Sequence, residues 1–244
     1  MAAADRRAVG ALVDVARGAT AARSFRAALS AAPDLSVIAE IKRRSPSKGD
    51  LHIGLDAAEL AASFVAGGAA CLSVLTDVEF FGGSIGDLQA ARAACAKPVL
   101  RKDFTIDARD VADTRLMGAD AVLLIAAALD DHELVDLHGL AIELGLDVLV
   151  EVHDEPELDV ALRAGATLVG VNQRDLTTFE VDHDRAARMS AAIPDGVVKV
   201  AESGVRGRDD AIRLADAGYD AILVGESLVT APDPAAAVRD LLGR

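Results

Sequence analysis

Charged and amide side chains stand at the ends of several short apolar runs that have the character of β-strands. The run at residues 37–42 contains Glu40 and ends in Lys42, so an acid and a base are separated by a single residue. Other runs end in Lys102, Glu151, Asn172 and Glu202. Lysine and glutamate are seldom buried without a partner, so their repeated appearance at strand ends indicates a shared polar site.

These residue types can perform acid–base chemistry. An ammonium group and a carboxylate in a half-buried site shift each other's pKa, and the pair can then donate and accept protons. The chain has only five lysines, and two of them, Lys42 and Lys102, fall at these ends. A single example could be a structural salt bridge, but five strands that end in this way favour catalysis.

The histidines and cysteines do not have the spacing of a metal site, so we expect no metal. The histidines are His52, His132, His138, His153 and His183. We interpret them as surface or loop residues, and the interpretation is weakest for His153 because it closely follows Glu151.

The apolar runs alternate with amphipathic helical stretches along the whole chain. The predicted strands cover residues 37–42, 71–76, 98–103, 121–125, 147–152, 168–172, 197–202 and 221–225. The clearest helical stretches cover residues 56–66, 107–117, 156–164 and 208–217. Near-continuous hydrophobicity is typical of parallel strands covered by helices, and the strict alternation predicts βαβ units.

A repeat of two βα units is marked by glycines before the even-numbered strands. Gly67, Gly118, Gly165 and Gly218 are separated by 51, 47 and 53 residues. We expect each to supply the left-handed turn that ends a helix. Four such pairs with no surplus strand favour a closed (β/α)8 barrel, the TIM barrel, over an open doubly wound sheet.

The α/β barrel is predicted to occupy the chain as a single domain, residues 1–244. Residues 1–33 form an N-terminal helical extension, with helices around residues 7–17 and 24–31, and residues 34–244 form the barrel. Alternate side chains of a strand share a face, so Lys102 shares one with Leu100. If these faces point inward, the polar ends converge at the C-terminal mouth, where barrel enzymes have their active sites.

The loops after the last two strands suit a phosphate group. They contain Ser203, Gly204, Gly225 and Glu226. Barrels frequently bind phosphate here through backbone N–H groups, and glycine allows an anion to approach closely, although each glycine could simply serve a turn. Residues 43–49 add a loop rich in hydroxyl groups and cations, or else a mobile solvated loop.

Net charge limits the partners that we expect. The formal charge of −14 disfavours binding to nucleic acid and to anionic membranes. No apolar stretch reaches the roughly 18 residues that a membrane span needs, and no signal peptide is visible. We therefore expect a cytoplasmic protein that binds a phosphorylated small molecule, as a monomer or weak homo-oligomer, without nucleic acid or membrane.

The motif at residues 40–49, Glu-x-Lys-x-x-Ser-Pro-Ser-Lys-Gly, closely resembles the first-strand signature of the indole-3-glycerol phosphate synthase family. Further matches are Leu100-Arg101-Lys102-Asp103-Phe104, Phe80-Phe81-Gly82-Gly83-Ser84, Val150-Glu151-Val152-His153, Gly170-Val171-Asn172-x-Arg174-Asp175-Leu176, Ala201-Glu202-Ser203-Gly204 and Val224-Gly225-Glu226-Ser227. They run in order from about residue 36 to residue 229. Gln173 departs from the family, which often has Asn there.

The resemblance implies a carboxy-lyase of tryptophan biosynthesis that works without a cofactor. This family converts 1-(2-carboxyphenylamino)-1-deoxyribulose 5-phosphate to indole-3-glycerol phosphate, carbon dioxide and water. Lys102 would be the general acid at the ketone oxygen, and Glu151 would transfer protons during dehydration. Lys42 would hold the substrate carboxylate or also serve as an acid, and the resemblance leaves open which lysine serves each proton transfer. Glu40, Asn172 and Glu202 would orient these groups and bind sugar hydroxyls. The implied substrate- and phosphate-binding residues are Ser45, Ser203, Gly204, Gly225, Glu226, Arg174, Phe81, Phe104 and Leu176, the last three in the anthranilate pocket.

Two other functions remain open at this point. The chain could be another phosphate-binding barrel enzyme, such as a sugar-phosphate isomerase, or a barrel that binds a ligand without catalysis. A pure binder has no need for two acids and two lysines around one ligand. An isomerase releases neither carbon dioxide nor a fluorescent indole.

Overall fold

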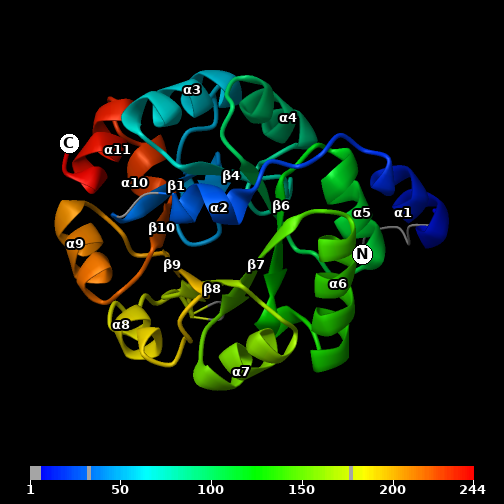
Figure 1. Cartoon of the computed structure of the whole chain (residues 1–244). Helices are drawn as coiled ribbons and strands as arrows, with labels where there is room; N and C mark the ends of the chain where they lie inside the picture. The colour runs from blue at the N-terminus through cyan, green and yellow to red at the C-terminus, as the bar shows by residue number, and fades with distance from the viewer. Residues whose placement is uncertain (1–6, 32–33, 176–177) are drawn as a thin grey trace.

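The computed structural model describes residues 7–31, 34–175 and 178–244. Within them, eight parallel strands close into a barrel in the order β1-β10-β9-β8-β7-β6-β5-β4, with helices around the outside (Figure 1). The strands are β1 (Ser36–Ile41), β4 (Cys71–Leu75), β5 (Val99–Lys102), β6 (Ala121–Ile125), β7 (Asp147–Val152), β8 (Leu168–Asn172), β9 (Val198–Glu202) and β10 (Ala221–Val224). The predicted TIM barrel is confirmed.

The segment after β1 is more ordered than the sequence suggested. β2 (Arg44–Ser45) and β3 (Gly49–Asp50) pair in antiparallel fashion and form a small hairpin. A run of only two residues carries no hydrophobic period, so the hairpin could not be predicted from pattern.

The helices cover the outer face of the barrel. They are α3 (Ala57–Gly67), α4 (Ile85–Ala93), α5 (Ala108–Leu116), α6 (Asp131–Glu143), α7 (Glu155–Arg163), α8 (Arg185–Ser190), α9 (Arg208–Asp216), α10 (Glu226–Val229) and α11 (Pro234–Leu242), with a 3-10 turn η1 (Ala126–Ala128). The four helices predicted by residue range agree to within one residue at each end. Across the described residues, no helix is both long and apolar enough to span a bilayer.

Glycines end several of these helices as predicted, with one exception. Gly118, Gly165 and Gly218 have φ angles of 89°, 91° and 87°, in the left-handed region. The prediction for Gly67 was wrong, because the left-handed residue is Gly68, with φ 104°. A Cβ on Gly67 would lie 2.6 Å from the backbone oxygen of Ala235, so this glycine instead allows α3 and α11 to pack closely.

The strand faces divide the apolar residues into two clusters. Residues that point into the barrel form the inner cluster, which includes Ile38, Leu100, Leu149 and Val200. Each of these lies two residues before one of the polar strand ends, so the predicted inward face is confirmed. Alternate residues of the same strands pack outward against the helices.

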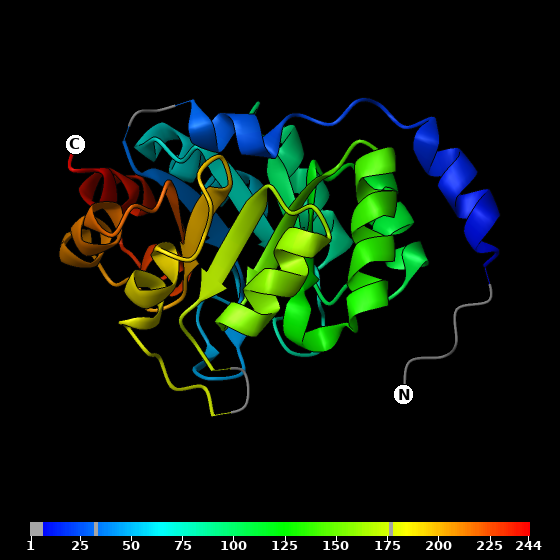
Figure 2. The ribbon, with the colours of Figure 1, turned by 60° about the horizontal axis from the view of Figure 1, so that its bottom comes forward.

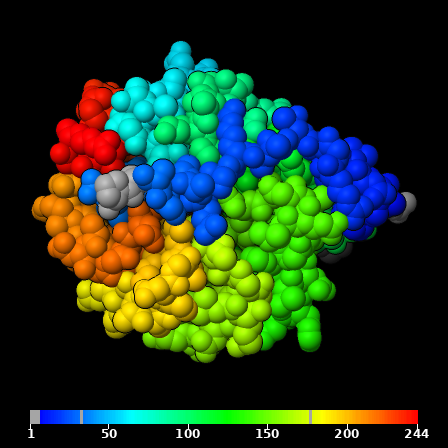
Figure 3. All heavy atoms as spheres, viewed as in Figure 1, coloured from blue at the N-terminus to red at the C-terminus, as the bar shows by residue number. Residues whose placement is uncertain are grey.

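A short helix closes the N-terminal end of the barrel. α1 (Val9–Arg17) and α2 (Phe25–Ser30) precede β1, and α2 lies across the end opposite the C-terminal strand ends (Figures 1 and 2). Phe25 and Leu29 are buried in the inner cluster. Figure 3 shows α2 covering the centre of this face. The other end therefore provides the access to the barrel interior.

Candidate active site

A cavity of about 420 Å³ lies at the C-terminal end of the barrel, a size that suits a small molecule. The predicted site residues that line it are Glu40, Lys42, Ser45, Phe81, Lys102, Phe104, Glu151, Asn172, Arg174, Glu202, Ser203, Gly204, Gly225 and Glu226. Leu176, the remaining predicted residue, lies outside the described residues. The structure thus brings side chains from separate strands around one space.

Lys102 lies between two carboxyl groups inside this cavity. Its Nζ is 3.0 Å from Glu151 Oε2 and 3.6 Å from Glu202 Oε2. Burial by itself lowers the pKa of Lys102, but the charges of Glu151, Glu202 and Glu40 outweigh burial and raise that pKa above its usual value. Lys102 is therefore a charged ammonium group at neutral pH and holds a proton that it can donate.

Glu151 is ionised although it is almost completely buried. Burial raises the pKa of Glu151, but the charge of Lys102 and a hydrogen bond from Asn172 outweigh it and leave the pKa below its ordinary value. Asn172 Nδ2 donates to Glu151 Oε1 at 2.9 Å, so the amide also fixes the orientation of the carboxylate. A buried, oriented carboxylate is suited to accept a proton.

Glu202 has the opposite electrostatic environment. Burial and the nearby charge of Glu151 raise the pKa of Glu202 to about 8, despite the opposing effect of Lys102. Its Oε1 has no hydrogen-bond partner among the described residues, and a Cβ on Gly170 would collide with that atom. Gly170 therefore makes room for Glu202. The only signal in the sequence is a glycine inside a strand, which marks a close approach without naming the neighbour.

A second acid–base pair is supplied by β1. Lys42 Nζ lies 2.6 Å from Glu40 Oε1, and both side chains are largely buried. A Cβ on Gly225 would stand 2.5 Å from Glu40 Oε1 and 3.0 Å from Lys42 Nζ. The sequence suggested that Gly225 lets an anion approach the backbone; in the structure it also makes space for this pair.

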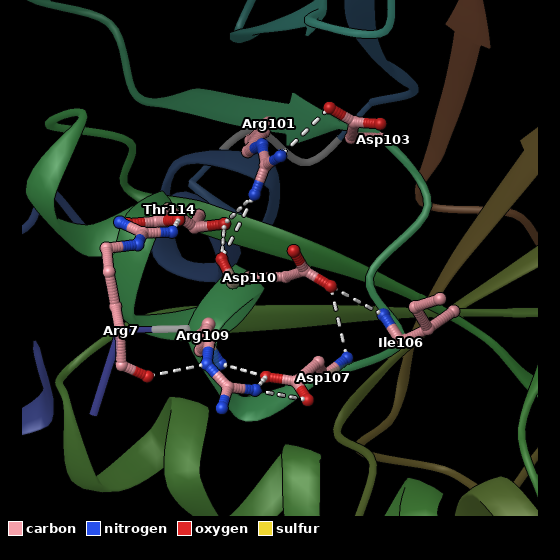
Figure 4. A network of polar contacts seen from close by, with 9 residues as sticks. Arg7, Arg101, Asp103, Ile106, Asp107, Arg109, Asp110 and Thr114 are labelled. Atoms are coloured by element: carbon pink, nitrogen blue, oxygen red, sulfur yellow. Dashed lines mark hydrogen bonds and ion pairs between the residues drawn. The ribbon is translucent and has the colours of Figure 1, made fainter. Parts of the chain in front are cut away.

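The strand end that carries Lys102 is fixed from outside the barrel by Arg101. This buried guanidinium points toward α5 and donates to Thr76 Oγ1 at 3.0 Å, Thr114 Oγ1 at 3.0 Å and Asp103 Oδ2 at 2.9 Å. Figure 4 shows the contacts to Asp103 and Thr114 within a wider network on α5. The network holds β4, β5 and α5 together directly behind Lys102.

The loops after β9 and β10 form the far side of the cavity. Ser203 and Gly204 have φ angles of 67° and 76°, and such a conformation is uncommon for serine. Gln173 Nε2 donates to the carbonyl oxygen of Ser203 at 2.7 Å and stabilises the turn. Lys48 Nζ lies 3.7 Å from Glu226 Oε1, so a cation from the β2–β3 hairpin also reaches this side.

Aromatic side chains form the apolar side of the cavity. Phe81 and Phe104 line it together with Leu123 and Ile125. Phe80 packs edge to face against Phe104, with ring centroids 6.3 Å apart. Such a wall suits a planar apolar ring.

Two histidines lie closer to the cavity than the sequence suggested. His183 lines it, and His153 Nε2 lies 3.8 Å from Glu151 Oε1. The spacing of two residues from Glu151 was the available signal for His153, since it places both on one face. The surface-or-loop interpretation was wrong for His138, which is buried on α6, where burial lowers its pKa.

Metal chemistry has no obvious ligands at this mouth. Within the ranges that the structure describes, no group of three or more His, Cys, Asp or Glu side chains is arranged to hold a metal ion. The lysine, glutamate and amide groups of this mouth can transfer protons and stabilise an anionic ligand.

Comparison with solved structures bears on the fold. Thiamine phosphate pyrophosphorylase from Pyrococcus furiosus superimposes with a TM-score of 0.65 over 90% of this chain and 96% of that protein. The two sequences are only 17% identical, so the likeness shows the barrel alone.

Comparison of sequences shows the family. The profile of the indole-3-glycerol phosphate synthase family matches residues 2–241. The chain is 56% identical to indole-3-glycerol phosphate synthase of Nocardioides sp. (strain ATCC BAA-499 / JS614), over 90% of this chain and 82% of that protein. It is 50% identical to that of Mycolicibacterium gilvum (strain PYR-GCK), over 97% of this chain and 88% of the relative. The chain belongs to the indole-3-glycerol phosphate synthase family.

Proposed function

We propose that the barrel mouth converts 1-(2-carboxyphenylamino)-1-deoxyribulose 5-phosphate to indole-3-glycerol phosphate by ring closure, decarboxylation and dehydration. Membership of the family makes the chain a carboxy-lyase of tryptophan biosynthesis. The observation that carries the assignment of residues is the position of Lys102, in contact with Glu151 and Glu202 inside a cavity that also contains Lys42.

Ring closure requires a proton donor at the ketone. The new carbon–carbon bond joins the ketone carbon to the ring carbon that bears the carboxylate, and negative charge develops on the ketone oxygen. Lys102 donates its proton to that oxygen. An oriented cation in a partly buried cavity also stabilises the developing charge more strongly than water does.

Lys42 holds the substrate carboxylate before it departs. Glu40 lies 2.6 Å from the Lys42 ammonium and orients it. As carbon dioxide leaves, the carboxylate loses its charge, and the adjoining apolar wall of Phe81 and Phe104 favours that loss.

Dehydration requires a base. The hydroxyl made in the first step leaves as water, and the neighbouring carbon loses a proton to complete the indole ring. Glu151, ionised and held by Asn172, takes that proton. Glu202, whose pKa is raised to about 8, is protonated at neutral pH and donates a hydrogen bond to a sugar hydroxyl.

The remaining predicted residues bind the two ends of the substrate. Ser45, Ser203, Gly204, Gly225 and the backbone of Glu226 surround the phosphate, with Arg174 beside them. Phe81, Phe104 and Leu176 hold the anthranilate ring. Because the net charge of −14 repels anions at long range, the phosphate depends on these local groups.

The cellular setting follows from the same proposal. The partner is this phosphorylated small molecule rather than nucleic acid or membrane, and the protein acts in the cytoplasm as a monomer or weak homo-oligomer. The acidic surface supports this assignment, because it disfavours binding to other polyanions.

Steady-state turnover of the carboxyphenylamino substrate tests the function. We expect one equivalent of carbon dioxide for each equivalent of a product with indole fluorescence. Consumption of the substrate without carbon dioxide, or turnover of a sugar phosphate in its place, would contradict the proposal.

A further inference from the structure

A row of titratable side chains leads from Glu151 to the outer surface. His153 Nε2 lies 3.8 Å from Glu151 Oε1, and His153 Nδ1 lies 3.1 Å from Glu157 Oε2. The exposed fractions of the three side chains rise from 1% for Glu151 to 13% for His153 and 23% for Glu157. The row therefore joins a buried carboxylate to solvent.

Glu157 orients the imidazole of His153. Glu157 Oε2 accepts a hydrogen bond from the backbone N–H of His153 at 2.7 Å, in addition to its contact with the ring. His153 Nε2 is buried and has no hydrogen-bond partner among the described residues. A buried polar atom without a partner is costly, so its place beside Glu151 calls for an explanation.

The proposed reaction, on which this inference rests, consumes protons. The ketone oxygen takes one proton from Lys102, and the hydroxyl takes a second from the Glu202 carboxyl group when its carbon–oxygen bond breaks and it leaves as water. The carboxylate leaves as neutral carbon dioxide, and its electron pair returns to the ring. One proton is released to Glu151 when the indole forms. Two protons are delivered and one is recovered, so each turnover takes one proton from solvent.

We propose that Glu157 and His153 form the path by which that proton enters, and that Glu151 passes it to Lys102. The proton moves from Glu157 Oε2 to His153 Nδ1 while Nε2 gives its own proton to Glu151 Oε1. The Glu151 carboxyl group then rotates so that this proton faces Lys102 Nζ, which lies 3.0 Å from Oε2, and Lys102 in turn replaces the proton of Glu202, 3.6 Å away. The gap of 3.8 Å between His153 and Glu151 exceeds a hydrogen bond by about 1 Å, which a side-chain rotation closes. The Nε2–H tautomer returns when the side chain rotates toward solvent, where Nδ1 gives its proton to water and Nε2 takes one from water.

This path remains open when substrate fills the cavity. Neither His153 nor Glu157 is among the described residues that line the cavity, whereas Glu151 and Lys102 are. A bound substrate therefore shields Lys102 from water on the cavity side and leaves the route along α7 free. Among the described residues, Glu151 and Glu157 are the charged groups in contact with His153, and Lys102 lies beyond Glu151.

His153→Gln tests the relay, because an amide can occupy the site of the imidazole without carrying protons. The first turnover uses protons already on the enzyme, so we expect a burst of about one product equivalent per site. Steady-state kcat then falls by about 10²-fold or more, the lower end of the usual contribution of a proton-transfer group. Glu157→Gln keeps the acceptor for the His153 N–H and should show the same pattern less strongly.

Added imidazole separates proton delivery from packing. It should restore much of the kcat of His153→Gln and leave the wild-type rate unchanged. Glu155→Gln, on the same turn of α7 but exposed, is the matched control and should behave as wild type.

Two results would overturn the relay. One is a wild-type kcat for His153→Gln without a burst; the other is a reduced kcat that shows neither burst nor imidazole rescue. In both cases the wild-type protein still forms indole-3-glycerol phosphate. Failure of the relay is therefore distinct from failure of the proposed function, in which the wild-type protein forms none of this product.

Discussion

The two carboxyl groups around Lys102 have pKa values that are shifted in opposite directions. Glu151 is held ionised by Lys102 and Asn172, whereas Glu202, buried beside the charge of Glu151, has a pKa of about 8. Environments that separate the pKa values of neighbouring acids allow one to act as a base and the other to donate a hydrogen bond. The roles proposed for Glu151 and Glu202 therefore depend on side-chain positions that differ by a few ångströms.

Glu202 should make the stability of the fold fall as pH rises. Its pKa is raised to about 8 in the folded state, against an ordinary value of 4.5. Between these values the folded chain binds more protons than the unfolded chain, so the free energy of unfolding decreases with rising pH. Glu202→Gln removes this titration. We expect chemical unfolding at pH 6 and pH 8 to show this difference. As pH rises, the free energy of unfolding of the variant should increase relative to that of the wild type by about 1 kcal/mol per pH unit.

A matched substitution checks the source of that effect. Glu133→Gln, in the first turn of α6 and not among the residues that line the cavity, should follow the wild-type pH dependence. If Glu202→Gln also follows the wild type over this range, the carboxyl group is not protonated at neutral pH and its proposed donation to the substrate is wrong.

Glu151→Gln should cut kcat by a factor of about 10² to 10⁴, the usual contribution of a general acid or base. Glutamine keeps an oxygen to accept from Asn172, so the fold and the substrate KM should change little. Steady-state kinetics beside a thermal unfolding curve measures both. If the variant retained more than half the wild-type kcat, the proposal that Glu151 transfers protons would be contradicted.

At the scale of elements, sequence pattern predicted the strand ends because a simple period and the closure of the barrel set them. A period of two residues places Lys102, Glu151, Asn172 and Glu202 on inward faces, and the parallel barrel brings these faces to one end. The sequence could not show why residue 170 is a glycine, because the glycine makes room for Glu202 on the neighbouring strand. Contacts of that kind depend on register between strands, which no local pattern encodes.

The network around Arg101 should couple stability to catalysis. Arg101→Lys loses the forked contacts that join Thr76, Asp103 and Thr114, and a lysine cannot reproduce them. We expect a loss of about 2–4 kcal/mol in the free energy of unfolding and a lower kcat, because Lys102 is the next residue. Urea unfolding and kinetics on one preparation would show both.

Arg109→Lys is the matched control for this prediction, since Arg109 belongs to the same network at its more exposed edge (Figure 4). It should lose less than about 1 kcal/mol, as exposed ion pairs do. Equal losses for the two variants would show that the network does not hold the strand end.

At the scale of the whole molecule, the closed end of the barrel lies opposite the end that holds the cavity. α2 seals the N-terminal end, with Phe25 in the inner apolar cluster, while the cavity occupies the other end (Figure 2). Barrels characteristically keep stability at one face and catalysis at the other. Substitutions at the two ends should therefore affect different quantities.

Phe25→Ala should lower the free energy of unfolding by about 3–5 kcal/mol, because it leaves a cavity in a fully buried cluster. Below the unfolding temperature its KM should match the wild type. Phe104→Ala removes a ring that is 46% exposed at the mouth, so it should raise KM and cost little stability. An increase in KM for Phe25→Ala, with no change in KM for Phe104→Ala, would contradict the assignment of Phe25 to stability and of Phe104 to substrate binding.

The whole account depends on Lys102 as the proton donor in ring closure, and single-turnover kinetics of Lys102→Ala tests it most directly. We expect product formation to fall at least about 10²-fold with the fold retained, and Lys102→Arg to fall similarly because a guanidinium stays protonated. Lys97→Ala, a lysine outside the cavity, should behave as wild type. Near-full turnover by Lys102→Ala would contradict the account.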